Sequence, residues 1–203
     1  MEERYYLFYM LVGFLSGSVL FAYEIPRLMK GVDVRKESKD GNPGTFNAFV
    51  CGGIGCGIAT LFAELFKGFW PVFLCRRQLG TESLLFAGVL AAPVFGHAFS
   101  VFHKGKGGKG IAVSFGVLLG LLPLWRPVFS LVFFYLLFSL VLPIKSHLKR
   151  SVVTFLCFSA TMLLTMPIPC IRRGCMALSG VVVFKHCEPY LAALPRRKKW
   201  RTE

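Results

Sequence analysis

Long stretches almost free of charge limit the folds open to this chain more than any other feature. Residues 5–25 carry one charged side chain, residues 125–144 carry one, and residues 152–171 carry none. Apolar runs of about 18 residues or more are typical of transmembrane helices, because a helix satisfies its own backbone hydrogen bonds where lipid offers no partner. The runs are continuous rather than alternating, which favours helices over strands. We therefore expect an all-α, polytopic helical bundle in a membrane.

About seven transmembrane helices fit the chain, although two of the segments are short and five spans are an alternative. The first run follows Met-Glu-Glu-Arg rather than a basic segment, so we expect a retained helix and not a signal peptide. The expected membrane domain covers residues 1–194, and a basic tail follows over residues 195–203. The predicted spans are 5–26, 46–66, 83–101, 110–124, 127–144, 151–168 and 174–186.

The distribution of basic residues predicts the orientation of the bundle. The chain has 24 Lys and Arg against 10 Asp and Glu. When the predicted loops are assigned alternately to the two sides of the membrane, 17 of these 24 basic residues fall on the side of the C-terminus and seven on the other side. The positive-inside rule then places the C-terminus in the cytoplasm and the N-terminus outside, in an inner (plasma) membrane. We expect the basic tail to contact anionic lipid headgroups, and nucleic acid is a poor partner for so embedded a chain.

Small residues and one ion pair predict contacts inside the bundle. Two pairs of glycines have the small-x-x-x-small spacing of closely packed membrane helices. Glu64 and Lys67 lie three residues apart at the end of the second predicted span, where we expect them to pair. The glycine pairs are Gly13 with Gly17 and Gly53 with Gly57.

Three polar or glycine-rich segments fall on the predicted cytoplasmic side, and this coincidence makes them the candidate sites. The first, residues 31–47, is dense in charge and contains a Gly-Asn-Pro-Gly turn. Loops with Gly, Asn and Ser can direct backbone amides at an anion, and the helix that follows presents the positive end of its dipole. The alternative is a solvated turn between two spans.

The second segment runs from Gly96-His97 to residues 103–110, where three lysines alternate with four glycines before an apolar helix. Glycines let a backbone approach a phosphate closely, and lysines supply positive charge. The segment is not a nucleotide-binding P-loop, because the Gly-x-x-x-x-Gly-Lys-Ser/Thr spacing fails. A flexible basic loop is the alternative, although such a loop seldom needs glycine at four of six positions.

The third segment, residues 185–189, places a histidine two residues before a glutamate at the end of the last predicted span. Such groups at a membrane surface can bind a hydroxyl or accept a proton, although they are also typical of a solvated helix end. The sequence shows no serine-hydrolase elbow, metal-ligand cluster or dinucleotide fingerprint. We therefore expect neither a metal nor a cofactor.

Taken in order, the motifs of this chain resemble those of the bacterial acyl-phosphate-dependent glycerol-3-phosphate acyltransferases, a family of small membrane enzymes with seven spans. The resemblance covers nearly the whole chain, and the lysine-glycine loop is its most specific part. The motifs are Gly17-Ser18, Gly31-Val32-Asp33-Val34-Arg35, Gly41-Asn42-Pro43-Gly44-Thr45 with Asn47, Glu64-x-x-Lys67-Gly68, Gly96-His97, Lys106-Gly107-Gly108-Lys109-Gly110 and Lys185-His186.

The resemblance implies transfer of a fatty acyl group from acyl phosphate to the 1-hydroxyl of glycerol 3-phosphate, giving lysophosphatidic acid. It implies no metal and no coenzyme A thioester, and the His-x-x-x-x-Asp motif of thioester-dependent acyltransferases is indeed absent. The catalytic candidates are Lys106, Ser151 and His186. The substrate-binding candidates are Arg35, Ser38, Asn42, Gly44, Asn47, His97, Lys106, Gly107, Gly108, Lys109 and Thr154.

Three positions depart from the motifs of that family. Asp40 stands where the family has a serine that contacts substrate, Val50 where it has an arginine, and Pro189 where it has an asparagine. The candidates to replace the missing contacts are Arg35, Ser38 and Lys39. A catalytically weakened relative that acts as a partner or regulator of lipid synthesis is therefore the alternative. A small-solute transporter is disfavoured, because the chain shows no internal repeat.

Overall fold

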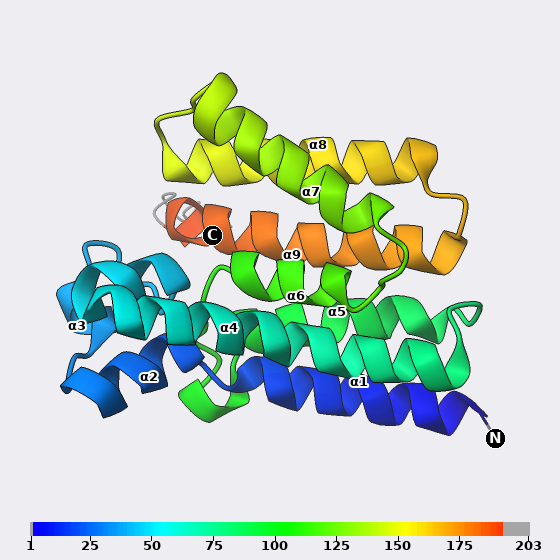
Figure 1. Cartoon of the computed structure of the whole chain (residues 1–203), viewed down its shortest axis with the longest axis horizontal. Coiled ribbons are helices and arrows are strands. Elements are labelled where there is room, and N and C mark those ends of the chain that lie inside the picture. Colours follow the sequence, from blue (N-terminus) through cyan, green and yellow to red (C-terminus); the bar gives the residue numbers. More distant parts are fainter. Residues whose placement is uncertain (1, 193–203) are drawn as a thin grey trace, which may run out of the picture.

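The computed structural model describes residues 2–192, and every regular element in this range is a helix. The long helices lie roughly side by side along the longest axis of the molecule (Figure 1). The predicted all-α membrane bundle is confirmed, whereas the basic tail predicted over residues 195–203 lies outside the described part. The helices are α1 (Glu2–Ser18), α2 (Phe21–Lys30), α3 (Val34–Glu37), α4 (Thr45–Leu79), α5 (Leu85–Ala98), η1 (Val101–His103), α6 (Ile111–Leu119), α7 (Arg126–Leu136), η2 (Leu137–Val141), α8 (His147–Thr165) and α9 (Pro169–Ala192).

Helix α5 lies at the centre of the bundle, between α1 on one side and α9 on the other. Helix α4 packs against α1, α2 and α6, and α8 packs between α9 and α7 (Figure 1). This order brings the start of α4, the start of α8 and the end of α9 to the same end of the molecule as α2 and α3. The loop between α4 and α5 lies at the opposite end, together with the start of α1.

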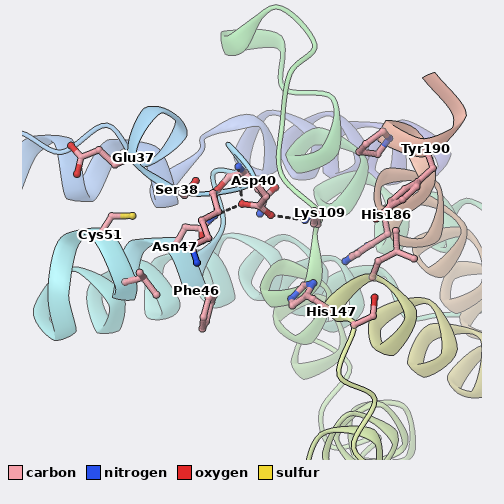
Figure 2. A pocket seen from close by; sticks show the side chains of 16 residues that line it. Glu37, Ser38, Asp40, Phe46, Asn47, Cys51, Lys109, His147, His186 and Tyr190 are labelled. Atoms are coloured by element: carbon pink, nitrogen blue, oxygen red, sulfur yellow. Dashed lines mark hydrogen bonds and ion pairs between the residues drawn. The ribbon is translucent and has the colours of Figure 1, made fainter. Parts of the chain in front are cut away.

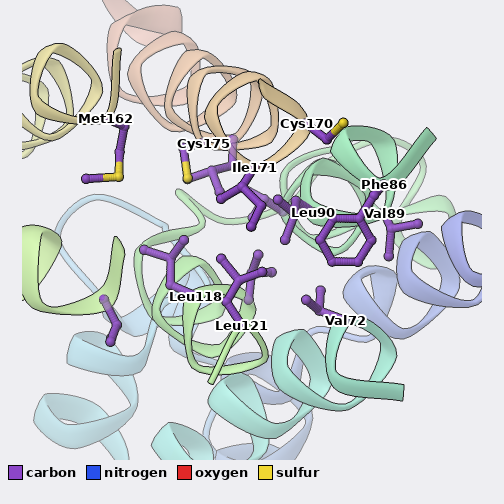
Figure 3. Packing of buried hydrophobic residues seen from close by; sticks show 14 of the residues in the cluster. Val72, Phe86, Val89, Leu90, Leu118, Leu121, Met162, Cys170, Ile171 and Cys175 are labelled. Carbon is purple, nitrogen blue, oxygen red and sulfur yellow. The ribbon is translucent and has the colours of Figure 1, made fainter. Parts of the chain in front are cut away.

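Buried apolar side chains from seven helices, α5 and α6 among them, form the core. Figure 3 shows Ile171 of α9 next to Leu90 of α5, between Leu118 of α6 on one side and Phe86 of α5 on the other. Large apolar side chains also cover the outside, as at Leu164, which is 84% exposed. Lipid explains why these helices are apolar all round, since an outer surface in water would be polar.

Glycines bring α1 and α5 into close contact, as predicted for Gly13 and Gly17. A Cβ on Gly13 would lie 3.2 Å from the Pro93 ring, and one on Gly17 would collide with the Pro93 carbonyl. The second predicted pair was wrong. Gly53 has a φ of +83° at a kink in α4, and the neighbour of Gly57 is the Phe49 ring of the same helix. The spacing there serves the bend of α4 rather than a contact between helices.

Judged by length and composition, fewer helices qualify as membrane spans than the seven predicted. Three described helical segments are long and apolar enough to cross a membrane, namely α4, α5 with η1, and α8. A fourth is added if α1 and α2, which are bent by 41° relative to each other, form one broken span. Helix α6 has only 9 residues, so the count of seven is not confirmed.

Two predicted loops are helical. The prediction ended the second span at residue 66, but α4 continues to Leu79. The prediction also placed a loop over residues 169–173, where α9 begins with Pro169 at its first position. Proline is tolerated in the first turn of a helix, where its missing N–H has no intrahelical partner to bond.

Candidate functional site

A pocket of about 880 Å³ opens at the end of the bundle where the first and third polar segments meet Lys109 of the second (Figure 2). Its wall comes from the α3–α4 loop, the first turns of α4 and α8, and the end of α9. The structure therefore brings together segments more than 100 residues apart in the chain. The lining residues are Glu37, Ser38, Lys39, Asp40, Asn42, Phe46, Asn47, Val50, Cys51, Lys109, Ser146, His147, Leu148, His186, Pro189 and Tyr190.

Asp40 links the first polar segment to the lysine-glycine loop. Its Oδ2 accepts a hydrogen bond from Lys109 Nζ at 2.7 Å, and its Oδ1 accepts one from Asn47 Nδ2 at 2.8 Å (Figure 2). Asn47 Nδ2 also donates to the Asn42 carbonyl at 2.8 Å, which holds the turn before α4. Burial raises the pKa of the Asp40 carboxyl, but the hydrogen bonds from Lys109 and Asn47 outweigh it and lower that pKa below its ordinary value. Asp40 is therefore a carboxylate at neutral pH.

The glycines of the lysine-glycine loop pack against the end of α5. The Gly108 amide donates to the His97 carbonyl at 3.0 Å. A Cβ on Gly108 would lie against the His97 ring and 3.0 Å from the Pro43 carbonyl, and one on Gly107 would collide with the His97 carbonyl. The Gly108 N–H is therefore already used inside the protein, whereas the close approach of this loop to a phosphate stays a prediction.

Lys106 and Lys109 face different pockets. Lys109 lines the large pocket, whereas Lys106 lines a basic pocket of about 540 Å³ together with Arg35, His103 and Lys104. Arg35 pairs with Asp33 at 3.2 Å, and its guanidinium lies 3.6 Å from the centre of the Tyr23 ring. The structure thus separates two candidate residues, Arg35 and Lys106, from the group around Lys109 and His186.

Two histidines lie side by side in the wall of the large pocket. The rings of His147 and His186 are stacked, with centroids 5.8 Å apart and planes inclined by 19°. His186 Nδ1 lies 2.8 Å from the Val182 carbonyl, so this nitrogen carries the hydrogen. His186 Nε2 is buried and has no hydrogen-bond partner among the described residues. It is therefore free to accept a proton or a hydrogen bond from a ligand.

His147 was missed by sequence analysis. It is the first residue of α8 and belongs to no motif, so only the packing of α8 on α9 reveals it. Ser151 and Thr154 follow it on the same face of α8. Both are buried, with hydroxyl oxygens that have no partner among the described residues, and neither lines the large pocket or the two smaller pockets next to it. The structure does not bring these two candidates into contact with the large pocket.

A buried ion pair lies behind the loop. Lys67 Nζ is 2.8 Å from Glu64 Oε2, as predicted, and 3.0 Å from His97 Nδ1. The two residues lie in the middle of α4 rather than at a helix end. Lys67 also donates to the Val19 carbonyl at 2.5 Å, and Glu64 accepts from the Ala22 amide at 3.3 Å. This cluster connects the break between α1 and α2 with His97, whose carbonyl accepts the hydrogen bond of the Gly108 amide.

A second pocket of about 240 Å³ continues from the large one between α4, α6 and α7. Gly44, Asn42, Glu64, His97 and Lys109 form its polar wall. Its other side is largely apolar. The apolar and aromatic lining residues are Phe46, Leu61, Ile111, Ala112, Phe115 and Tyr135. The two pockets together thus place an apolar wall beside the charged group of Lys109.

The departures from the expected motifs all border the large pocket. Asp40 bonds Lys109, and Val50 and Pro189 lie in the wall. The three positions that depart from the expected motifs therefore lie around one pocket. Among the described residues, no group of three or more His, Cys, Asp and Glu side chains is arranged to hold a metal ion.

Comparisons with known proteins show the family to which this chain belongs. The profile of the family described as Glycerol-3-phosphate acyltransferase matches residues 7–192. Glycerol-3-phosphate acyltransferases of Thermotoga petrophila and Thermosipho melanesiensis are 40% and 39% identical over 53% and 64% of this chain. The matched segments span 54% and 60% of those two proteins, little more than half of their length.

A solved structure matches nearly the whole chain. The crystal structure of PlsY (YgiH), an integral membrane glycerol 3-phosphate acyltransferase, in its glycerol 3-phosphate form superposes with a TM-score of 0.79. The identity is 25%, and the match covers 92% of this chain and 90% of that one. The match confirms the expected resemblance: this chain belongs to the glycerol-3-phosphate acyltransferase family.

Proposed function

We propose that this chain transfers a fatty acyl group from acyl phosphate to the 1-hydroxyl of glycerol 3-phosphate, forming lysophosphatidic acid for phospholipid synthesis. The observation that carries the proposal is the large pocket, which is lined by Lys109 and by His186, whose buried Nε2 has no partner among the described residues. Membership of the family supports the same reaction. The substrates are acyl phosphate and glycerol 3-phosphate, and the donor reaches the site from membrane lipid.

The reaction asks for charge neutralisation and orientation more than for a nucleophilic side chain. The hydroxyl oxygen attacks the acyl carbonyl carbon, the bond from that carbon to the phosphate oxygen breaks, and inorganic phosphate leaves. We assign the proton of the hydroxyl to His186 Nε2 and the charge of a phosphate to Lys109. The donor is already activated, so holding the two reactants in line supplies much of the rate.

The two phosphorylated substrates match the two pockets on either side of the α3–α4 loop. We place one phosphate at Lys109, with Ser38, Asn42 and Asn47 nearby, and the other at Lys106 and Arg35. The apolar pocket beyond Lys109 then takes the acyl chain. Gly44 and His97 shape that pocket, whereas Gly107 and Gly108 fix the loop. Ser151 and Thr154 remain predictions, with buried hydroxyls one and two turns along α8 from His147.

The pocket end of the bundle is proposed to face the cytoplasm of a cell with the chain in its inner (plasma) membrane. The excess of basic residues on that side and the water-soluble acceptor support this orientation. The membrane domain would then extend over residues 1–194, with the basic tail 195–203 on the lipid headgroups. The start of α1 would lie at the outer surface, opposite the pocket.

The purified protein in detergent tests the function directly. Acyl phosphate with labelled glycerol 3-phosphate is expected to give labelled lysophosphatidic acid, and acyl coenzyme A in a parallel sample is expected to give none. Equal turnover of the thioester would refute the donor assignment. Asp40, Val50 and Pro189 favour a second candidate, a catalytically weakened relative with a regulatory role. Substrate binding without product from folded protein would establish that candidate instead.

A further inference from the structure

The Asp40 carboxylate is already paired with Lys109, the cation to which a substrate phosphate would bind. The Asp40 carboxylate and the Lys109 ammonium are 2.7 Å apart, with 48% and 23% of their side chains exposed. The second oxygen of the carboxylate, Oδ1, is also held in place, because Asn47 Nδ2 and the Asn42 amide both donate to it, at 2.8 and 3.3 Å. Three contacts thus hold it over Lys109, so the pair is a built feature and not a chance surface contact (Figure 2).

The charges of the large pocket balance without a ligand. Its charged lining residues are two acids, Glu37 and Asp40, and two bases, Lys39 and Lys109. With His147 and His186 neutral, their formal charges sum to zero. A phosphate dianion that enters this pocket must therefore displace a carboxylate or meet its repulsion, since like charges in close contact oppose binding.

We propose that Asp40 is a specificity-determining residue that competes with the substrate phosphate for the ammonium of Lys109. The proposal rests on the proposed function, because it concerns the phosphate of that reaction. A monoanion gains little when it replaces a carboxylate, since one negative charge is exchanged for another. A dianionic phosphate brings two charges and three acceptor oxygens, so it can displace Asp40 and still gain. Asp40 thus lowers the affinity for every anion by the free energy of breaking its pair with Lys109, so an anion binds only if it gains more from Lys109 than the carboxylate does.

The variant Asp40→Asn tests this by removing the charge while nearly keeping the shape. Calorimetric titration of the variant in detergent is expected to show roughly threefold to tenfold tighter binding of inorganic phosphate and glycerol 3-phosphate. Chloride, which we expect to compete weakly in the wild type, should inhibit phosphate binding more strongly in the variant. In the Lys109→Met background, Asp40→Asn should no longer tighten binding, because the contested cation is gone.

Glu82→Gln is the matched control. It makes the same change of net charge in the α4–α5 loop, at the opposite end of the bundle (Figure 1). It should leave the phosphate affinity at the wild-type value. Equal tightening in Glu82→Gln would show a general field effect and overturn the proposal, as would unchanged affinity in Asp40→Asn or tightening that persists with Lys109→Met.

Steady-state kinetics of Asp40→Asn show which substrate's phosphate binds Lys109. The KM of each substrate is measured while the other substrate is saturating. A lower KM for glycerol 3-phosphate assigns its phosphate to Lys109, and a lower KM for acyl phosphate assigns the donor's phosphate there. A KM unchanged for both overturns the proposal even where free phosphate binds more tightly. Product formation by the wild type decides the function separately, so failure of one leaves the other standing.

Discussion

At the scale of single residues, Gly108 shows how packing determines a motif. Sequence analysis selected this glycine because it would let the backbone approach a phosphate, and the structure adds a packing reason for glycine at this position. Its amide is bonded to the His97 carbonyl, and the place of a side chain is taken by the His97 ring and the Pro43 carbonyl. A phosphate-binding loop and a tightly packed loop have the same composition. Only the fold, which brings Pro43 and His97 together, distinguishes them.

Gly108→Ala is expected to lower stability by about 1–3 kcal/mol, because overpacking forces the loop away from α5. Gly180→Ala is the control, since Gly180 is exposed on α9 and a Cβ there meets nothing within 4 Å. Thermal unfolding of both variants in detergent measures the difference. A loss no larger than that of the control would contradict the packing explanation.

His186 is the residue for which the structure gives the clearest chemical role. Because its Nδ1 is bonded to the Val182 carbonyl, its Nε2 is left as the acceptor. We expect His186→Gln to lower kcat roughly a hundredfold or more and to change KM much less, as for the loss of a general base. Steady-state acyl transfer at matched expression provides both constants. A raised KM with an unchanged kcat would show that His186 only binds substrate.

At the scale of elements, α4 shows why helix ends are hard to predict. The apolar run ends near Lys67, and so the prediction ended the span there. The helix continues because Glu64 neutralises the lysine inside the bundle, with exposed fractions of 1% and 2%. The existence of the helices follows from their apolar residues, whereas their ends depend on partners from distant segments, such as Val19 and His97.

Lys67→Met is expected to cost about 3–5 kcal/mol, because it leaves the Glu64 carboxylate buried without its ammonium. The double variant Glu64→Leu with Lys67→Met should recover much of this loss, since it removes both charges. Thermal unfolding in detergent compares the two variants with the wild type. A double variant less stable than Lys67→Met alone would show that the pair stabilises the bundle by more than mutual neutralisation.

At the scale of the whole molecule, the fold gathers the polar segments at one end, as the charge distribution predicted. That reasoning identified the segments but not how they divide between pockets, because the α3–α4 loop separates Lys106 from Lys109 only in three dimensions. The sequence also did not predict that His147 lines the large pocket or that Asp40 pairs with Lys109. Each depends on a contact between segments that no local pattern encodes.

The orientation of the bundle is open to a separate test. A reporter that is active only outside the inner membrane should be silent when fused after the C-terminal residue, and active when fused before the N-terminal one. The 17-to-7 division of basic residues is the reason. The reverse pattern would place the large pocket outside the cell and remove it from the soluble acceptor.

Acyl transfer by three proteins at matched expression tests the central claim, that the pocket end of this bundle makes lysophosphatidic acid. The wild type should form the product from acyl phosphate and glycerol 3-phosphate. Lys109→Ala should be roughly tenfold to a hundredfold slower, because a charge-assisted contact to phosphate is lost. Arg173→Ala removes an exposed cation near the start of α9, at the other end, and should match the wild type. Equal rates in all three proteins, or no product from the wild type, would contradict the account.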